Sequence, residues 1–158
     1  MDLQSIRNQI TGELDGAGIQ YKIKPHTSPV FTSEDAARER GVTLKQIVKT
    51  MILRDKHGRI VVALLPGDHR LHIKRINRLL GGNFQLMSPE EVESTMGLVV
   101  GAISPVGLIS RGWEMVADPD VFVNEWVDIS SGDPSAGIEL RSTDLRTFLR
   151  CRVDAISR

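Results

Sequence analysis

The sequence predicts an α+β fold, with one mixed, curved and barrel-like β-sheet flanked by helices. Three observations support this prediction. Apolar residues recur at helical spacing near both ends of the chain, strand-like segments lie between them, and the two kinds of segment do not alternate as in βαβ proteins. The 158 residues are enough for one sizeable core and contain no linker, repeat or low-complexity tract, so residues 1–158 are expected to be a single domain.

The first half of the chain predicts two helices followed by a β-hairpin and a third helix. Helical spacing of apolar residues runs over 3–14, with glycines after it, and Thr32 can cap a second helix that Gly41 ends. Alternating residues predict a short strand over 19–23. Two apolar stretches separated by a polar turn predict a hairpin, and helical spacing then returns before Gly81; these segments are 46–53, 60–65 and 71–80.

The second half predicts short strands between two further helices. Ser88, followed by Pro89 and Glu91, marks the start of a helix that Gly97 ends. Ser142 or Thr143 is expected to cap the last helix, which carries Leu145, Phe148 and Leu149. Strands are expected over 84–87, 115–116, 121–123, 126–129 and 137–140.

The composition is that of an ordinary globular protein of a reducing compartment. Apolar residues make up 41% and charged residues 25% of the chain, and the net charge is zero. The zero net charge argues against a general nucleic-acid coating protein but not against a local basic patch. Cys151 is the only cysteine, so no intramolecular disulfide is expected. No secretory signal or membrane-spanning run is present, so a cytoplasmic location without membrane association is expected.

Lys49 is the most unusual residue of the predicted strands. It shares one strand face with Ile47, Met51 and Leu53, so its charge points into a face that is otherwise apolar. The plain interpretation is a lysine whose stem packs while its amine reaches water. The alternatives are a cation that anchors a phosphate or polarises a carbonyl, a general base, or an amine that forms a Schiff base.

Two other stretches are candidates for function. The apolar segment 101–107 contains two glycines and a proline, and such a bent loop can bring backbone N–H groups close to developing negative charge, or simply join two core strands. Arg70, Lys74 and Arg78 recur at a spacing of four in a run without acids, which suits either a phosphate backbone or a solvated helix face.

Metal chemistry receives no support from the sequence. The four histidines and Cys151 lack zinc-ligand spacing. Asp118, Asp120 and Asp128 are expected to cap turns. We therefore expect neither a metal nor a cofactor.

Together these residues resemble the YbaK / prolyl-tRNA synthetase insertion-domain family of trans-editing aminoacyl-tRNA deacylases. The resemblance rests on Val48-Lys49-Thr50 after a helix that ends at Gly41, and on Gly101-x-x-x-Pro105 followed by Gly107. It extends over nearly the whole chain and implies a YbaK-like fold.

The resemblance also implies roles for individual residues. Lys49 corresponds to the lysine required for hydrolysis, and the N–H of Gly101 is implied to orient the aminoacyl end. Val106 stands where a phenylalanine is common and His26 where some members have a tyrosine, which leaves the amino-acid specificity open. The residues implied to bind substrate are His26, Thr32, Ser33, Thr50, Ser104, Pro105, Val106, Gly107 and Gly132, and those implied to contact tRNA are Arg70, Lys74 and Arg78.

The implied function is that of a freestanding hydrolase. Its substrate would be tRNA-Pro or a related tRNA carrying a small wrong amino acid such as Ala, Cys or Ser, and its partners would be aminoacyl-tRNA and an aminoacyl-tRNA synthetase. Two alternatives stay open: a non-catalytic tRNA- or nucleotide-binding module that uses the same pocket, and a lysine-dependent enzyme that forms a Schiff base.

Overall fold

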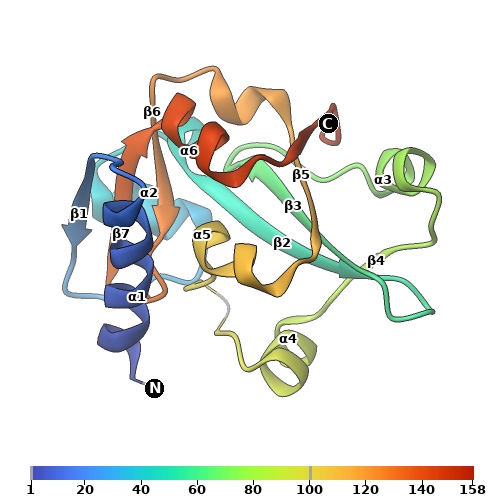
Figure 1. Ribbon diagram of the computed structural model, residues 1–158, viewed down its shortest axis with the longest axis horizontal. Helices are drawn as coiled ribbons and strands as arrows, with labels where there is room; N and C mark the ends of the chain where they lie inside the picture. Colours follow the sequence, from blue (N-terminus) through green and yellow to red (C-terminus); the bar gives the residue numbers. More distant parts are fainter. Residues whose placement is uncertain (1, 100) are drawn as a thin grey trace.

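The structure is a computed structural model that describes residues 2–99 and 101–158, and it consists of two β-sheets with helices around them (Figure 1). The helices are α1 (Leu3–Gly16), α2 (Ser33–Arg40), α3 (Ile73–Leu80), α4 (Pro89–Met96), α5 (Pro105–Leu108) and α6 (Ser142–Leu149), with 3₁₀ turns η1 (Leu44–Gln46), η2 (Ile109–Arg111) and η3 (Pro119–Phe122). The strands are β1 (Tyr21–Pro25), β2 (Val48–Arg54), β3 (Ile60–Pro66), β4 (Gln85–Leu86), β5 (Glu114–Ala117), β6 (Trp126–Ser130), β7 (Ala136–Arg141) and β8 (Arg152–Val153). Within the described ranges, no helix is long and apolar enough to cross a membrane.

The two sheets differ in size and in strand direction. The smaller is antiparallel, with strand order β1-β7-β6, and the larger has the order β4-β2-β3-β5-β8. In the larger sheet β2 pairs antiparallel with β3 and β4, whereas β3 with β5 and β5 with β8 are parallel pairs. The α+β prediction and the predicted 46–65 hairpin are confirmed.

The prediction of one barrel-like sheet is not confirmed, because the strands form two open sheets. A bridge between Ile47 and Asp128 links them just before β2 begins. Because β3 covers the other edge of β2 over its full length, β6 and β4 both reach β2 along the same edge. In the described residues the two sheets therefore stay separate along β2, and neither closes into a barrel.

Local signals in the sequence account for most helix ends. The side chains of Thr32 and Ser88 cap α2 and α4, as predicted. Gly41, Gly81 and Gly97 adopt left-handed conformations that end α2, α3 and α4.

Several predictions for individual segments are wrong. Helix α6 begins at Ser142 itself, and no side chain caps it. The strand predicted over 121–123 does not form. Residues 119–122 form η3 instead, because Pro119 follows Asp118, whose side chain accepts a hydrogen bond from the N–H of Asp120. Helix α3 begins at Ile73, so Arg70 lies before it and does not continue the helical spacing of Lys74 and Arg78.

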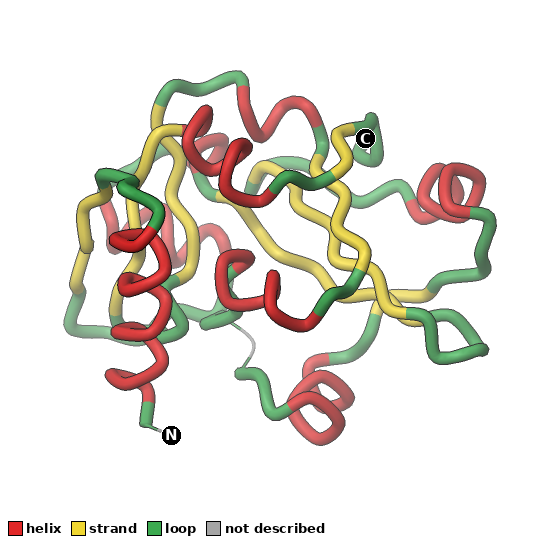
Figure 2. The backbone as a smooth tube through the Cα atoms, in the orientation of Figure 1, coloured by secondary structure: helices red, strands yellow, loops and turns green. Residues whose placement is uncertain are grey.

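The larger sheet is covered on both faces, as the apolar residues of 46–53 predict. Val48 and Ile52 belong to the main core, while Leu53 on the opposite face belongs to a second core with Ile76 and Phe84. Figure 2 shows α1, α5 and α6 together on the near side of the strands, where residues of all three helices contribute to the main core.

Asp118 fastens the end of the chain to the larger sheet. One carboxylate oxygen accepts a hydrogen bond from the N–H of Asp120, and the other accepts from the N–H groups of Ile156 and Ser157 and from the Ser157 hydroxyl at 2.7 Å. His69, Asp118 and Asp120 lie close enough together to hold a metal ion. The donors that already occupy both oxygens of Asp118 give this cluster a structural role, and the turn-capping role predicted for Asp118 is confirmed.

We expect Asp118→Ala to lower the free energy of unfolding by about 2–4 kcal/mol, because it leaves two buried N–H groups of the C-terminal segment without an acceptor. Urea denaturation measures this change. The exposed Asp120→Ala serves as control and should stay within about 0.5 kcal/mol of the wild type. Equal effects of the two substitutions would contradict the role of Asp118.

Candidate active site at the open edge of strand β2

Strand β2 has one edge that faces away from β3. Two strands pair with this edge at its two ends, and they leave a gap between them. At its start β6 reaches this edge through the bridge between Ile47 and Asp128. Near the end of β2, strand β4 pairs with the same edge, and the Met87 N–H donates a hydrogen bond to the carbonyl of Ile52. Successive residues of a strand direct their backbone groups to opposite edges, so the N–H and C=O of Thr50 face the same side as those of Ile52. They therefore point into the gap between β6 and β4.

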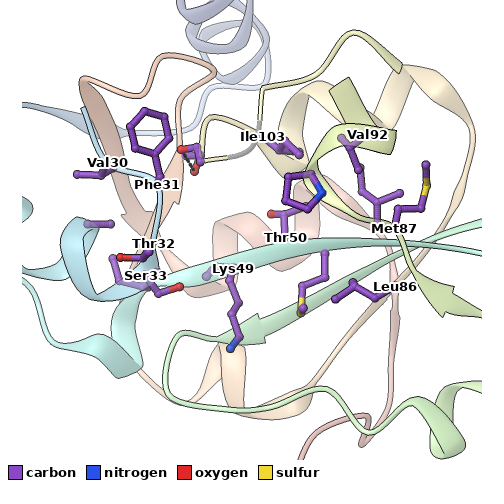
Figure 3. Close-up of a pocket in the computed structure, with 18 of the residues that line it drawn as sticks. Val30, Phe31, Thr32, Ser33, Lys49, Thr50, Leu86, Met87, Val92 and Ile103 are labelled. Carbon is purple, nitrogen blue, oxygen red and sulfur yellow. Dashed lines mark hydrogen bonds between the residues drawn. The ribbon is translucent and has the colours of Figure 1, made fainter. Parts of the chain in front are cut away.

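A cavity of about 300 Å³ opens at this gap (Figure 3). Its wall comes from five parts of the chain that are far apart in the sequence. These are α2 with the segment before it (Val30, Phe31, Thr32, Ser33, Ala36, Arg40), the β2 segment from Ile47 to Ile52, the β4–α4 region (Leu86, Met87, Pro89, Val92), the loop residues Gly101 and Ile103, and Ser130 at the end of β6. The cavity thus brings together five residues that the sequence singled out: Thr32, Ser33, Lys49, Thr50 and Gly101.

Lys49 and Thr50 leave β2 in opposite directions, as Figure 3 shows. Burial is the largest influence on Lys49 and lowers the pKa of its amine below the ordinary 10.5. The negative charges of Glu34 and Asp68 act in the opposite direction, and the positive charge of Arg70 lowers the pKa further. Within the described residues Lys49 forms no salt bridge, so its charge is open to an incoming anion or carbonyl.

Gly101 fits the cavity wall only because it lacks a side chain. Its φ is +91°, and a Cβ at this position would lie 2.6 Å from the carbonyl oxygen of Val30 and 2.9 Å from Cα of Phe31. The Ser130 hydroxyl donates to the carbonyl of Gly101 at 3.4 Å. The loop that carries Gly101 thus packs closely against Val30 and Phe31, which also form part of the cavity wall.

Other residues predicted to bind substrate lie outside this cavity. Ser104, Gly107 and Gly132 line a second cavity of about 330 Å³ beside α1. Gly132 allows α1 to pack closely, since a Cβ there would lie 2.5 Å from Cγ2 of Ile6. Pro105 and Val106 are buried in α5, so the bent 101–107 segment includes a short helix that the sequence did not predict.

His26 and the basic residues also lie apart from the cavity wall. The Nδ1 of His26 lies 2.6 Å from the carbonyl oxygen of Ser28, which fixes the ring against its own loop. Lys74 and Arg78 are exposed on α3. Arg70 is exposed too, and it is the member of this group whose charge acts on Lys49.

A buried ion pair at the cavity wall, formed by Arg40 and Asp128, was not predicted. Nη1 of Arg40 lies 2.6 Å from Oδ1 of Asp128, and the two side chains are 2% and 0% exposed. Asp128 was expected to cap a turn, but it lies within β6 instead. Beside the pair, Nζ of Lys24 contacts Glu139 at 2.7 Å.

The position of the ion pair depends on Gly137 in β7. A Cβ on this glycine would lie 2.5 Å from Nε of Arg40, so the guanidinium lies directly on the glycine backbone. Burial raises the pKa of Asp128 to about 6, although the charge of Arg40 partly offsets this rise. The one sequence signal for this pair was an acid in the middle of an apolar strand; Arg40 gave none, because its helix is rich in charged residues.

We expect Asp128→Leu to lower the free energy of unfolding by roughly 3–5 kcal/mol, because it leaves the Arg40 charge buried without its partner. The double variant Arg40→Leu/Asp128→Leu should recover most of that loss, since an apolar pair needs no charge compensation. Chemical denaturation of the wild type, both single variants and the double variant gives the coupling between the two positions. Additive effects would show that the pair does not act as a unit.

Comparison with known proteins agrees with this geometry. Residues 27–148 match the model of the aminoacyl-tRNA editing domain. The prolyl-tRNA editing protein ProX of Acetoanaerobium sticklandii is 27% identical, over 95% of this chain and 93% of its own length. A proline–tRNA ligase of Thermosipho melanesiensis is 34% identical over 61% of this chain. The chain spans only about a fifth of the length of such ligases.

Solved structures share the fold over almost the entire chain. The crystal structure of a hypothetical protein, 27% identical, superposes with a TM-score of 0.86 and covers 95% of this chain and 99% of its own. A protein proposed to be a trans-editing enzyme for prolyl-tRNA synthetase, 24% identical, superposes with a TM-score of 0.83 over 97% of both chains, which shows a common fold. Since the family model alone spans most of the sequence, the chain belongs to the aminoacyl-tRNA editing domain family.

Proposed function

We propose that this protein is an aminoacyl-tRNA deacylase that acts in trans on mischarged tRNA. The observation that carries the proposal is the cavity at the gap in β2, where a cationic side chain and two backbone segments face one small space inside a domain of the editing family. The resemblance to ProX over nearly its full length supports tRNA-Pro, or a related tRNA, as the acceptor. An aminoacyl-tRNA synthetase as partner and a cytoplasmic location accompany this proposal.

The proposed reaction is hydrolysis of the ester between the amino acid and the terminal ribose. The oxygen of a water molecule attacks the carbonyl carbon, the bond to the ribose oxygen breaks, and that oxygen takes up a proton, which leaves free amino acid and uncharged tRNA. Backbone N–H groups that face the reacting carbonyl stabilise the negative charge that develops on its oxygen. The N–H of Thr50 faces the gap in β2, and we assign it and the N–H of Gly101 to this task.

Lys49 serves in this proposal as a charged anchor for the terminal phosphate or for the ester carbonyl. Half-burial lowers the pKa of its amine, and an approaching phosphate would raise that pKa again, so substrate binding favours the charged form. Among the described residues that form the cavity wall there is no histidine, aspartate or glutamate to serve as a general base. We therefore assign activation of the water to the 2′-hydroxyl of the tRNA itself.

Residues around the mouth suit the rest of the acceptor end. Phe31 belongs to the cavity wall and is still 57% exposed, so it offers a flat face on which the terminal base can stack. Thr32 and Ser33 lie next to it. We keep Arg70, Lys74 and Arg78 as contacts to the tRNA backbone, which would make binding weaken steeply with added salt.

We expect Lys49→Ala to reduce deacylation of mischarged tRNA by roughly a hundredfold or more, because a charge that stabilises the reacting group is lost. Release of labelled alanine, serine and cysteine from tRNA-Pro measures this. Lys45→Ala removes an exposed lysine four residues away and should leave the rate unchanged. A folded wild type that binds the tRNA but hydrolyses none of the three esters would favour the binding-module alternative instead.

We expect Gly101→Ala to reduce deacylation by about a hundredfold, because its methyl group must displace the backbone of Val30 and Phe31 and with it the cavity wall. Gly97→Ala is the matched control: its φ of +67° imposes similar backbone strain, but no atom lies within 4 Å of the added carbon. The two rates, measured on variants of similar circular dichroism, separate the close contact from the strain. Equal losses would contradict a role of the Gly101 contact.

A further inference from the structure

The turn that joins β6 to β7, residues 131–135, holds both sides of a close contact in the cavity wall. Just before the turn, the Ser130 hydroxyl donates to the carbonyl of Gly101 at 3.4 Å. Within the turn, the carbonyl of Pro134 accepts from the N–H of Val30 at 3.0 Å. Gly101 and Val30 also touch each other, since a Cβ on Gly101 would lie 2.6 Å from the Val30 carbonyl oxygen. The place of the turn therefore fixes where the backbone of Gly101 lies at the cavity.

Hydrogen bonds within the turn hold it in one shape. The hydroxyl of the buried Ser131 accepts from the N–H of Asp133 at 3.2 Å and donates to the carbonyl of Ala136 at 2.6 Å. A carboxylate oxygen of Asp133 accepts from the N–H of Ser135 at 2.8 Å. Because an unpaired buried polar group costs free energy, these bonds are retained when the turn shifts. The turn therefore moves as a unit, and any displacement of it carries the cavity wall along.

Helix α1 holds this turn from outside, beside β7 (Figure 1). Gly132 in the turn has a φ of +88°, and a Cβ on it would lie 2.5 Å from Cγ2 of Ile6 and 2.9 Å from Cδ1 of Ile10. One residue further along each segment, Nη1 of Arg7 lies 3.4 Å from a carboxylate oxygen of Asp133. The helix thus contacts the turn both by close apolar packing and through an ion pair.

We propose that Ile6 and Arg7 are positioning residues of the active site, which act through the β6–β7 turn to hold the N–H of Gly101 at the reacting carbonyl. This inference rests on the proposed function, because it names further residues on which that reaction depends. Neither residue belongs to the described part of the cavity wall around Lys49, so both act at a distance. Helix α1 also precedes residues 27–148, the part of the chain that matches the editing-domain family.

Positioning by α1 is separable from its contribution to the core. Ile10 and Leu14 of the same helix are 4% and 0% exposed and belong to the main core, so their loss would destabilise the whole domain. The side chain of Arg7 is 23% exposed, and an ion pair at the surface contributes little to the stability of the fold. Removal of Arg7 therefore loosens the turn while the domain stays folded.

Hydrogen exchange measured by NMR tests the inference without turnover. The N–H groups of His26 and Val30 donate to carbonyls of the turn at 2.9 and 3.0 Å. We expect Arg7→Ala to speed the exchange of these two amides roughly tenfold, because local opening of the turn releases them. The amide of Asp118, whose hydrogen bond of 2.9 Å lies at the larger sheet, should keep its wild-type rate. Equal acceleration at all three amides would indicate global destabilisation and overturns the inference.

Kinetics on the alanyl ester of tRNA-Pro provide the second measurement. We expect Ile6→Ala to lower kcat roughly tenfold and to leave KM within about twofold, because a misplaced Gly101 N–H affects the transition state more than tRNA binding. Ile6→Val is the matched control, since it keeps the Cγ2 atom that lies on Gly132, and it should retain the wild-type kcat. Asn8→Ala removes an exposed neighbour of Arg7 in the same helix and should change neither kcat nor hydrogen exchange.

The outcomes are distinguishable from those of the proposed function. Wild-type exchange at His26 and Val30 in Arg7→Ala, or a wild-type kcat in Ile6→Ala, overturns the positioning role, while hydrolysis by the wild type still supports the deacylase. A loss that appears only in KM, or equally in Ile6→Ala and Ile6→Val, also overturns it. Faster exchange confined to His26 and Val30, together with no hydrolysis of any ester by the folded wild type, supports the link from α1 to the cavity wall and overturns the deacylase.

Discussion

The site depends on a constraint of β-sheet geometry: a strand has two edges, and β2 has three neighbours. Strand β3 occupies one edge from Val48 to Arg54, so β6 and β4 must share the other. They meet it at Ile47 and at Leu53, and the stretch between them is left to a ligand. Backbone groups that would otherwise pair with a strand thus become available at Thr50. The separation into two sheets and the existence of the cavity are consequences of the same arrangement.

Electrostatics within this gap differ from those of the molecule as a whole. The chain carries no net charge, yet two cationic side chains among the described residues line its cavity, Lys49 and the buried Arg40. Arg40 is neutralised by Asp128, whereas the carboxylates that influence Lys49 lie beyond salt-bridge distance. Low exposure strengthens each of these interactions relative to water. The net charge of the whole chain therefore gives no information about the charge within the cavity.

Features that depend on a few neighbouring residues could be predicted from the sequence, whereas features that depend on contacts between distant residues could not. Helix caps at Thr32 and Ser88, and the glycine ends of three helices, involve contacts of a few residues and were predicted. Lys49 was recognised by strand alternation, and its grouping with Gly101 came from the family resemblance. The short helix α5 was missed because its proline and glycine also suit a loop, and η3 was missed because the apolar residues 121–123 also suit a strand. Arg40 and Asp128, 88 residues apart, become partners only through the tertiary fold, and no local pattern contains that information.

The contact between Gly137 and Arg40 also limits how this protein can change over evolutionary time. A side chain at position 137 would collide with the guanidinium, whereas a shorter residue at position 40 would collide with nothing on that side. Substitutions must therefore occur in a particular order: the arginine has to be replaced before the glycine can be. Lineages that pass through this intermediate would carry Asp128 buried without its partner, at a loss of stability. A buried ion pair that lies on a glycine in this way is thus easier to retain than to exchange one residue at a time.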